Sequence, residues 1–199
     1  MLKVALTGGI ATGKSHVLER LRRLGVQCLD ADVLAHGVMA PGTEASRAIA
    51  ARFGDGVLDA DGGVDRSVLG PIVFVDAAAR RDLEAIVHPA VYRAIEAGLR
   101  GFERLGARLA VVDIPLLYET GRASDFDRVI VTLCPPEAQL ARLVARGLDE
   151  RAARERLAAQ APTAEKAARA DFVIHTDGTL ADTDRQVDRV LQQLTALAA

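Results

Sequence analysis

Residues 8–15 read Gly-Gly-Ile-Ala-Thr-Gly-Lys-Ser and match the complete pattern G-x-x-x-x-G-K-[ST]. An apolar run, residues 2–6, precedes this stretch, and an amphipathic helical pattern begins at Lys14. Glycines let such a loop turn its backbone amides toward phosphate oxygens, and the N-terminus of the following helix favours the same anion. The stretch therefore predicts a strand, a phosphate-binding loop and a helix that together hold a nucleoside triphosphate.

The loop supplies the candidate nucleotide-binding residues. We expect Lys14 to reach the outer phosphates and Ser15 to bind the magnesium ion that accompanies ATP. Only three of the 25 basic residues are lysines, and a compact ammonium fits among phosphate oxygens where a planar guanidinium does not. A glycine-rich turn that binds nothing is the alternative, and the flanking strand and helix argue against it. The expected ATP-binding residues are Gly8, Gly9, Ile10, Ala11, Thr12, Gly13, Lys14, Ser15 and His16.

The composition is that of an ordinary soluble protein of one domain with insertions. Of the 199 residues, 50% are hydrophobic and 26% are charged, and the net charge is -2. No apolar run approaches the roughly 18 residues that cross a bilayer, so we expect a cytoplasmic protein without membrane or nucleic-acid partners. Cys28 and Cys134 lie in separate apolar runs, which favours buried thiols over a disulfide or a zinc site.

Five short apolar runs predict the strands of one sheet. They are continuous rather than alternating, as in parallel strands that helices cover on both faces. Helical patterns at residues 14–24, 136–146 and 180–197 lie between or after them. The order predicts an α/β fold with a five-stranded parallel sheet flanked by helices, of the kind found in P-loop NTPases. The runs are residues 2–6, 26–29, 109–112, 129–133 and 172–174.

Two segments interrupt this alternation. Residues 30–108 contain helical patterns at 46–53, 77–86 and 90–101, which predict a helical insertion that faces the substrate. Residues 137–170 hold two arginine-rich helical patterns and predict a second, smaller insertion after the fourth strand. We therefore divide the chain into a nucleotide-binding core, a helical insertion and this smaller insertion, which we call the lid. The core is 1–32, 107–135 and 171–199, the insertion is 33–106, and the lid is 136–170.

Carboxylates follow two of the predicted strands. If the chain is still extended after residue 29, Asp30 and Asp32 point to the same side, at the sheet edge where open α/β folds bind ligands. Asp32 then suits a base that accepts the proton of an attacking hydroxyl, or equally a cap for a helix that starts at Val33. Asp113 ends the third strand in the place of an acid that acts on magnesium, although many strands end in aspartate.

Two arginines in the predicted lid lie one helical turn apart. Arg142 and Arg146 therefore face the same way, and on a mobile lid they would close over the triphosphate and neutralise charge in the transition state. A solvated basic helix face is the alternative. His88, before Pro89, is by itself more typical of a packed or capping histidine than of a ligand.

Two classes of nucleotide-binding protein are disfavoured. The chain contains no asparagine, so the guanine-reading motif N-K-x-D of GTPases is absent. The spacing G-x-G-x-x-G is absent after the first strand, which disfavours a dinucleotide-dependent oxidoreductase. A small-molecule kinase and an ATP-binding regulatory protein remain.

Together these segments resemble the dephospho-coenzyme A kinase family over essentially the whole chain. The most distinctive are Asp30-Ala31-Asp32 after the second strand and Pro115-Leu116-Leu117-Tyr118-Glu119 after the third. The other matching segments are Leu6-Thr7-Gly8-Gly9-Ile10, Gly13-Lys14-Ser15, Pro41-Gly42, Phe53-Gly54, Asp65-Arg66, His88-Pro89, Gln139-Leu140 with Arg142, Gln160, and Ala170-Asp171 before Val173-Ile174.

The resemblance implies phosphorylation of the ribose 3′-hydroxyl of dephospho-CoA by ATP with Mg²⁺, the last step of coenzyme A biosynthesis. It implies that the insertion 33–106 binds coenzyme A and that Asp32 is the general base. Lys14, Arg142 and Arg146 would be catalytic as well. The implied acceptor-binding residues are Asp32, His88, Leu116, Tyr118 and Glu119.

This chain departs from the family's pattern at a few positions. Ala11-Thr12 stands where the family often has Gly-Ser, and His16 where threonine is common. Thr176 stands where the family tends to have asparagine, so we assign no adenine contact there. The alternatives are another kinase of this fold, such as a nucleoside or shikimate-type kinase, and a regulatory protein that binds ATP without using it. The Asp-Ala-Asp segment and the long helical insertion argue against the regulatory protein, because a protein that only binds ATP needs neither a base nor a cavity for an acceptor. The sequence carries no signal for an oligomeric state.

Overall fold

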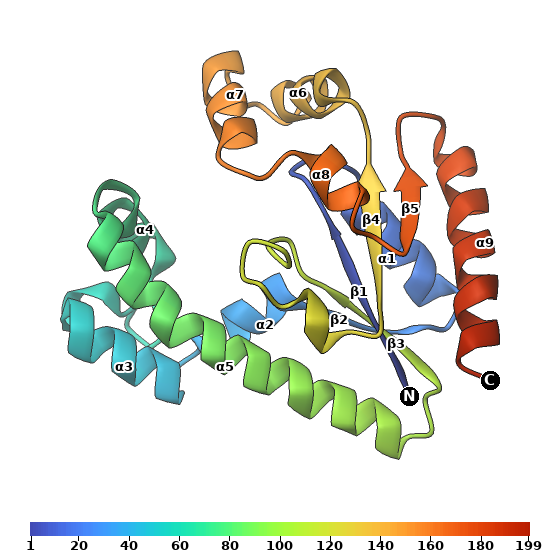
Figure 1. The fold of residues 1–199 in the computed structure, drawn as a ribbon. Coiled ribbons are helices and arrows are strands. Elements are labelled where there is room, and N and C mark those ends of the chain that lie inside the picture. Colours follow the sequence, from blue (N-terminus) through green and yellow to red (C-terminus); the bar gives the residue numbers. More distant parts are fainter. The chain divides into compact units, whose positions relative to one another are not determined.

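The structure is a computed structural model that describes residues 1–199. It contains one five-stranded sheet, in the order β2-β3-β1-β4-β5, with helices around it (Figure 1). The chain forms two compact units, one of residues 1–29 with 101–199 and one of residues 30–100. This architecture confirms the predicted α/β class.

The first unit is built on the sheet. Its strands are β1 (Leu2–Gly8), β2 (Gln27–Asp30, whose last residue begins the second unit), β3 (Leu109–Asp113), β4 (Arg128–Leu133) and β5 (Phe172–His175). β1 lies parallel to β3 on one side and to β4 on the other, and β4 lies parallel to β5. All five predicted strands are confirmed, although the edge strand β2 is only partly buried.

Helices α1 (Lys14–Arg23) and α9 (Leu180–Leu197) cover the sheet and close the core of the first unit. Both carry an apolar stripe at helical spacing, as the sequence predicted. α6 (Pro136–Ala145) and α7 (Glu150–Ala158) lie beyond the end of β4, and the short α8 (Thr163–Ala167) packs against β4 itself (Figure 1). The fully buried core residues include Val4, Leu6, Val17, Val111, Ile130, Ile174, Val187 and Leu194.

The second unit is helical. It contains α2 (Ala31–Val38), α3 (Glu44–Phe53), α4 (Arg66–Val75) and most of α5 (Ala77–Arg104), with a 3₁₀ turn at Asp55–Val57. Its own core consists of Met39, Ile49, Val57 and Leu69. α4 was not predicted, since it contains Pro71, and α2, only eight residues long, was considered only as a helix that starts at Val33. α4 nevertheless begins cleanly, because the Asp65 side chain accepts hydrogen bonds from the amides of Ser67 and Val68.

The helical patterns predicted at 77–86 and 90–101 are both confirmed as helix, but they belong to one element. A single helix, α5, runs through Pro89. A proline inside a helix removes one backbone hydrogen bond and strains the preceding turn. Here buried residues lie on both sides of it, among them Ala79, Val91 and Ile95, so the apolar stripe keeps the helix continuous.

No helix in the structure combines the length and the apolar character that crossing a membrane requires.

Candidate active site

The phosphate-binding loop connects the end of β1 to the start of α1. Tight packing explains the first glycine: a Cβ on Gly8 would lie 2.2 Å from Oγ1 of Thr132 and 2.6 Å from Oγ1 of Thr12. Those two hydroxyls share a hydrogen bond of 2.7 Å, and Thr12 also donates to the carbonyl of Gly9 at 2.8 Å. Gly13 has a φ of 81° and caps α1, a left-handed conformation that glycine adopts without strain.

Backbone amides converge where this loop becomes helix α1. The amides of Thr12 and His16 donate to the carbonyls of Gly9 and Gly13. The three amides between them, those of Gly13, Lys14 and Ser15, donate to no acceptor in the protein. Unpaired amides at a helix N-terminus form an anion-binding site, and the helix dipole adds to their positive potential. This is the arrangement that the sequence motif predicted.

Lys14 contacts a carboxylate that ends the neighbouring strand. Its Nζ lies 2.7 Å from Oδ1 of Asp113 and 2.9 Å from Oδ2. The sheet brings the two together, because Leu6 of β1 and Asp113 of β3 are register partners. Only 15% of the Lys14 side chain and 5% of the Asp113 side chain are exposed. The ion pair neutralises a carboxylate that would otherwise be costly to bury.

Arg142 contacts the loop and Arg146 does not. Nη1 of Arg142 donates to the carbonyl of Ala11 at 3.1 Å and to Oγ1 of Thr176 at 3.3 Å, and Nη2 donates to the carbonyl of Thr176. Arg146 follows the last residue of α6 and is exposed. Arg142 therefore joins the loop to the segment after β5. Arg146 lies just past the end of α6, so the two arginines do not share one face of the helix as predicted.

Thr176 has a structural role that the sequence did not reveal. It is buried, and its hydroxyl donates to the carbonyl of Thr12 at 2.7 Å. A cavity of about 630 Å³ lies alongside the loop in this unit, and Gly9, Cys134, His175 and Asp177 are among its lining residues. Burial raises the pKa of the Cys134 thiol, although the positive charge of Arg142 opposes that shift.

The two aspartates after β2 have different environments. Asp30 is the N-cap of α2, and its carboxylate accepts hydrogen bonds from the amides of Asp32 at 2.9 Å and Val33 at 3.2 Å. The helix thus begins at Ala31, and the expectations of an extended chain through Asp32 and of a helix starting at Val33 are both wrong. Because Asp30 does the capping, the Asp32 carboxylate remains exposed in the first turn of α2.

His16 points away from the loop. Its Nε2 lies 2.7 Å from Oδ1 of Asp184 in α9, so only its backbone belongs to the phosphate-binding loop. His88 is half-buried in the helical unit, where it lines a cavity of about 280 Å³ together with Met39 and Arg66. Arg66 also hydrogen-bonds to the ring of His36. No role was predicted for Arg66, although the Asp65-Arg66 pair is one of the segments that match the family's pattern.

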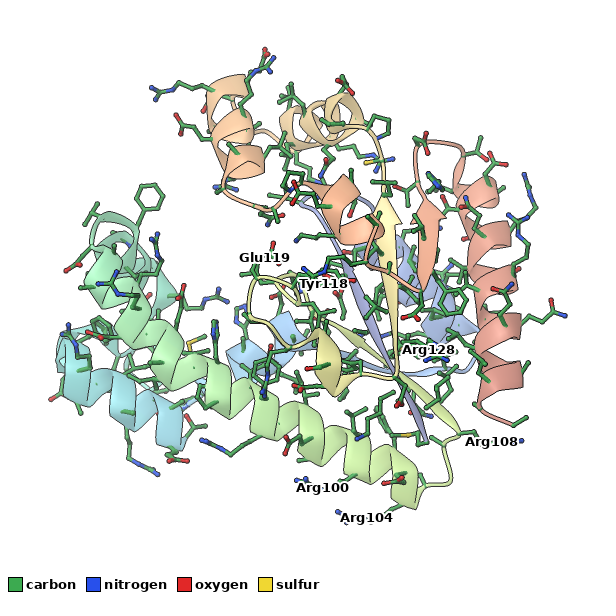
Figure 2. All side chains as sticks on the ribbon, in the orientation of Figure 1. Arg100, Arg104, Arg108, Tyr118, Glu119 and Arg128 are labelled. Atoms are coloured by element: carbon green, nitrogen blue, oxygen red, sulfur yellow. The ribbon has the colours of Figure 1, made fainter.

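Tyr118 and Glu119 lie on the loop that follows β3 (Figure 2). The guanidinium of Arg169 lies 4.3 Å from the centroid of the Tyr118 ring, and burial raises the pKa of the tyrosine. Oε1 of Glu119 lies 2.6 Å from Nζ of Lys166, a lysine of α8 whose side chain is 1% exposed. Lys166 is one of only three lysines in the chain, but nothing in the sequence indicates its partner. Leu116, on the same loop, is exposed.

Comparison with known proteins identifies the family. Residues 2–182 match the family model described as dephospho-CoA kinase. The dephospho-CoA kinases of Geobacillus kaustophilus and Geobacter sulfurreducens are 46% and 45% identical to this chain. The first alignment covers 98% of both chains, and the second covers 94% of this chain and 95% of its relative.

Solved structures agree with this match. A dephospho-CoA kinase from Campylobacter jejuni superimposes with a TM-score of 0.76 at 30% identity, covering 99% of this chain and 98% of that one. A shikimate kinase from Acinetobacter baumannii, at 16% identity and a TM-score of 0.51, covers 98% of this chain and 94% of its own and shares the fold alone. The chain therefore belongs to the dephospho-CoA kinase family.

Proposed function

We propose that this chain transfers the γ-phosphoryl group of ATP to the ribose 3′-hydroxyl of dephospho-CoA and releases coenzyme A and ADP. The observation that carries the proposal is the set of unpaired amides of Gly13, Lys14 and Ser15 beside the Lys14 ammonium, in a chain of this family. Such a site binds and orients a triphosphate, which is most of what catalysis of phosphoryl transfer requires.

Lys14 changes partners in this proposal. In the structure, Nζ of Lys14 lies 2.7 Å from the Asp113 carboxylate. The β- and γ-phosphates carry more charge and offer several oxygens, so they would draw Lys14 toward the loop. Asp113 would then be available to act on the metal ion, directly or through water.

The residues at this site fit Mg²⁺. Magnesium at a nucleotide site uses one or two protein oxygens together with phosphates and water, and no cluster of three or more His, Cys, Asp or Glu is present. The Ser15 hydroxyl is exposed in the first turn of α1, and the Asp113 carboxylate ends β3. These two would hold the ion, and the bound ion would neutralise charge that develops on the phosphate oxygens.

Asp32 is the proposed general base. As the 3′-oxygen bonds to the γ-phosphorus and the bond from that phosphorus to the bridging oxygen breaks, the carboxylate takes the hydroxyl proton. Because Asp30 caps α2, no backbone amide occupies the Asp32 carboxylate. Arg142 and Arg146 are proposed to stabilise the transferred charge. For Arg142 this requires release from the carbonyls of Ala11 and Thr176.

The acceptor is proposed to bind to His88, Leu116, Tyr118 and Glu119 in addition to Asp32. In the helical unit, the cavity that His88 lines is apolar along Met39, Leu69, Val73 and Leu83 and polar at Arg66 and Glu84. A pantetheine chain with a phosphate at one end has the same mixture of apolar and charged surface.

The proposal is tested by an acceptor panel. Purified protein is mixed with Mg-ATP and dephospho-CoA, adenosine or shikimate, and ADP release is followed. We expect turnover with dephospho-CoA and at most background hydrolysis with the others. Faster turnover with adenosine or shikimate would assign another kinase activity, and ATP binding without turnover on any acceptor would indicate a regulatory protein.

A further inference from the structure

Two glutamines from outside the phosphate-binding loop hydrogen-bond to the backbone of one residue in it. Nε2 of Gln139 in α6 donates to the carbonyl of Ile10 at 2.7 Å, and the amide of Ile10 donates to Oε1 of Gln160 at 2.9 Å. Backbone amides only donate and carbonyls only accept, so the Ile10 backbone dictates which end each glutamine presents. We call these two contacts the glutamine clamp.

The clamp lies in a closely packed site. Gln139 is 5% exposed. A Cβ on Gly9 would lie 2.7 Å from Nε2 of Gln139 and 2.3 Å from Oγ1 of Thr163. The segment from α6 to α8 therefore contacts the loop so closely that only glycine fits at position 9.

The clamp is adjacent to a strained residue. Ala11 has a φ of 59° and is the only residue other than glycine with a positive φ. Alanine disfavours this left-handed conformation, because its Cβ crowds the following carbonyl oxygen. The side chains of Ile10 and Ala11 belong to an apolar cluster with Leu143 and Ala153 of α6 and α7. The hydrogen bonds to Ile10 and the apolar contacts of Ile10 and Ala11 thus help to hold Ala11 in its strained conformation.

We infer that Gln139 and Gln160 are positioning residues that hold the loop in the shape that binds the triphosphate. Gln160 occupies the Ile10 amide, so that amide is withheld from the phosphates. The clamp fixes the backbone of Ile10, directly before the strained Ala11. The backbone conformation at Ala11 in turn determines where the amides of residues 13–15 point. It also couples the loop to the segment 136–163, which carries Arg142. The inference rests on the proposed use of ATP at this loop.

A matched pair of substitutions tests the clamp. Gln139→Glu and Gln160→Glu add the same charge next to the same residue, so general repulsion of ATP affects both alike. At position 160 the carboxylate still offers an acceptor to the Ile10 amide. At position 139 it offers no donor and faces the Ile10 carbonyl. We expect the KM for Mg-ATP to rise about five- to tenfold more in Gln139→Glu than in Gln160→Glu, with little difference in the KM for dephospho-CoA.

Uncharged variants give a second, independent measurement. Gln139→Met and Gln160→Met each remove one contact, and Gln193→Met on the exposed face of α9 is the control. We expect both clamp variants to bind ATP several-fold more weakly in calorimetry, and the double variant to lose less than the product of the two losses. Binding is measured well below each variant's melting temperature.

Two results would overturn the inference. One is an equal KM for Mg-ATP in the two glutamate variants, or the larger rise at position 160. The other is ATP binding by the methionine variants within twofold of the Gln193→Met control, which would leave the glutamines only a structural role. Failure of the proposed function itself looks different, because the unaltered protein would then not phosphorylate dephospho-CoA, whether or not it binds Mg-ATP.

Discussion

Replacing Lys14 by methionine tests the ion pair and the catalytic proposal together. Lys14 neutralises Asp113, and their side chains are only 15% and 5% exposed. Removing one partner of a buried pair leaves an uncompensated charge, which costs roughly 3–5 kcal/mol. Because Lys14 retains some contact with solvent, we expect a loss near the lower limit, about 3 kcal/mol. For a chain of 199 residues this lowers Tm by roughly 6–12 °C.

The control uses another lysine of the same chain. Lys3 is exposed on β1, and Lys3→Met is expected to change stability by no more than about 0.5 kcal/mol. The double variant Lys14→Met with Asp113→Asn also removes the carboxylate charge that Lys14 neutralises. We expect it to recover most of the lost Tm, but not phosphoryl transfer. Thermal unfolding by circular dichroism and ADP release measure the two effects separately.

The reasoning about this ion pair would be refuted by a Lys14→Met variant that melts within 2 °C, or about 1 kcal/mol, of Lys3→Met. It would also be refuted by a double variant that is less stable than Lys14→Met alone. Normal turnover by Lys14→Met would remove the lysine from the proposed chemistry.

Further predictions concern the base, the packing of the loop and the thiols. Asp32→Asn is expected to lower kcat about 10²- to 10⁴-fold with an unchanged KM for Mg-ATP, and turnover like that of the unaltered protein in steady-state assays would remove the base assignment. Gly8→Ala places its Cβ 2.2 Å from Oγ1 of Thr132 and should cost about 1–3 kcal/mol in urea unfolding. Gly101→Ala in α5, where a Cβ meets nothing within 4 Å, should instead stabilise the protein by about 0.5–1 kcal/mol. A Gly8→Ala variant that is more stable than Gly101→Ala would contradict this reasoning. Burial raises the pKa of Cys28 to about 11 and also raises that of Cys134, so the folded protein should react with iodoacetamide at pH 8 on the order of a hundredfold more slowly than the unfolded chain. Equal rates would show that the thiols are accessible and unperturbed.

The sheet could be predicted from the sequence because its signals are local. Each apolar run is a strand of the sheet, and the glycine-lysine-serine motif lies directly after the first of them. The first turn of α1 follows from the motif itself, since the loop requires a helix N-terminus beside the phosphates. The free amides at the start of α1 could therefore be predicted, whereas the ion pair between Lys14 and Asp113 could not.

The helical unit was harder to predict because its signals conflict. Pro89 favours a helix boundary, but α5 continues through it because buried apolar residues lie both before and after the proline. At the end of β2 either aspartate of the Asp30-Ala31-Asp32 segment could cap a helix, and only the structure shows that Asp30 does so. A shift of two residues there changes which carboxylate is left exposed.

Long-range partners of polar side chains were also beyond prediction. Lys166 was a conspicuous lysine, yet nothing in the sequence indicated that Glu119 would neutralise it in a buried position. The glutamines were visible only as parts of the family's pattern, and their contacts with Ile10 span more than 120 residues of chain. Such partners depend on how separate helices pack around the loop.

The most direct measurement is the identity and amount of the product formed from Mg-ATP and dephospho-CoA. Phosphorus NMR and mass spectrometry of the completed reaction should show one new phosphate monoester on the ribose 3′-oxygen for every ADP released. Phosphate on another oxygen, or ADP that accumulates without a phosphorylated acceptor, would contradict the account.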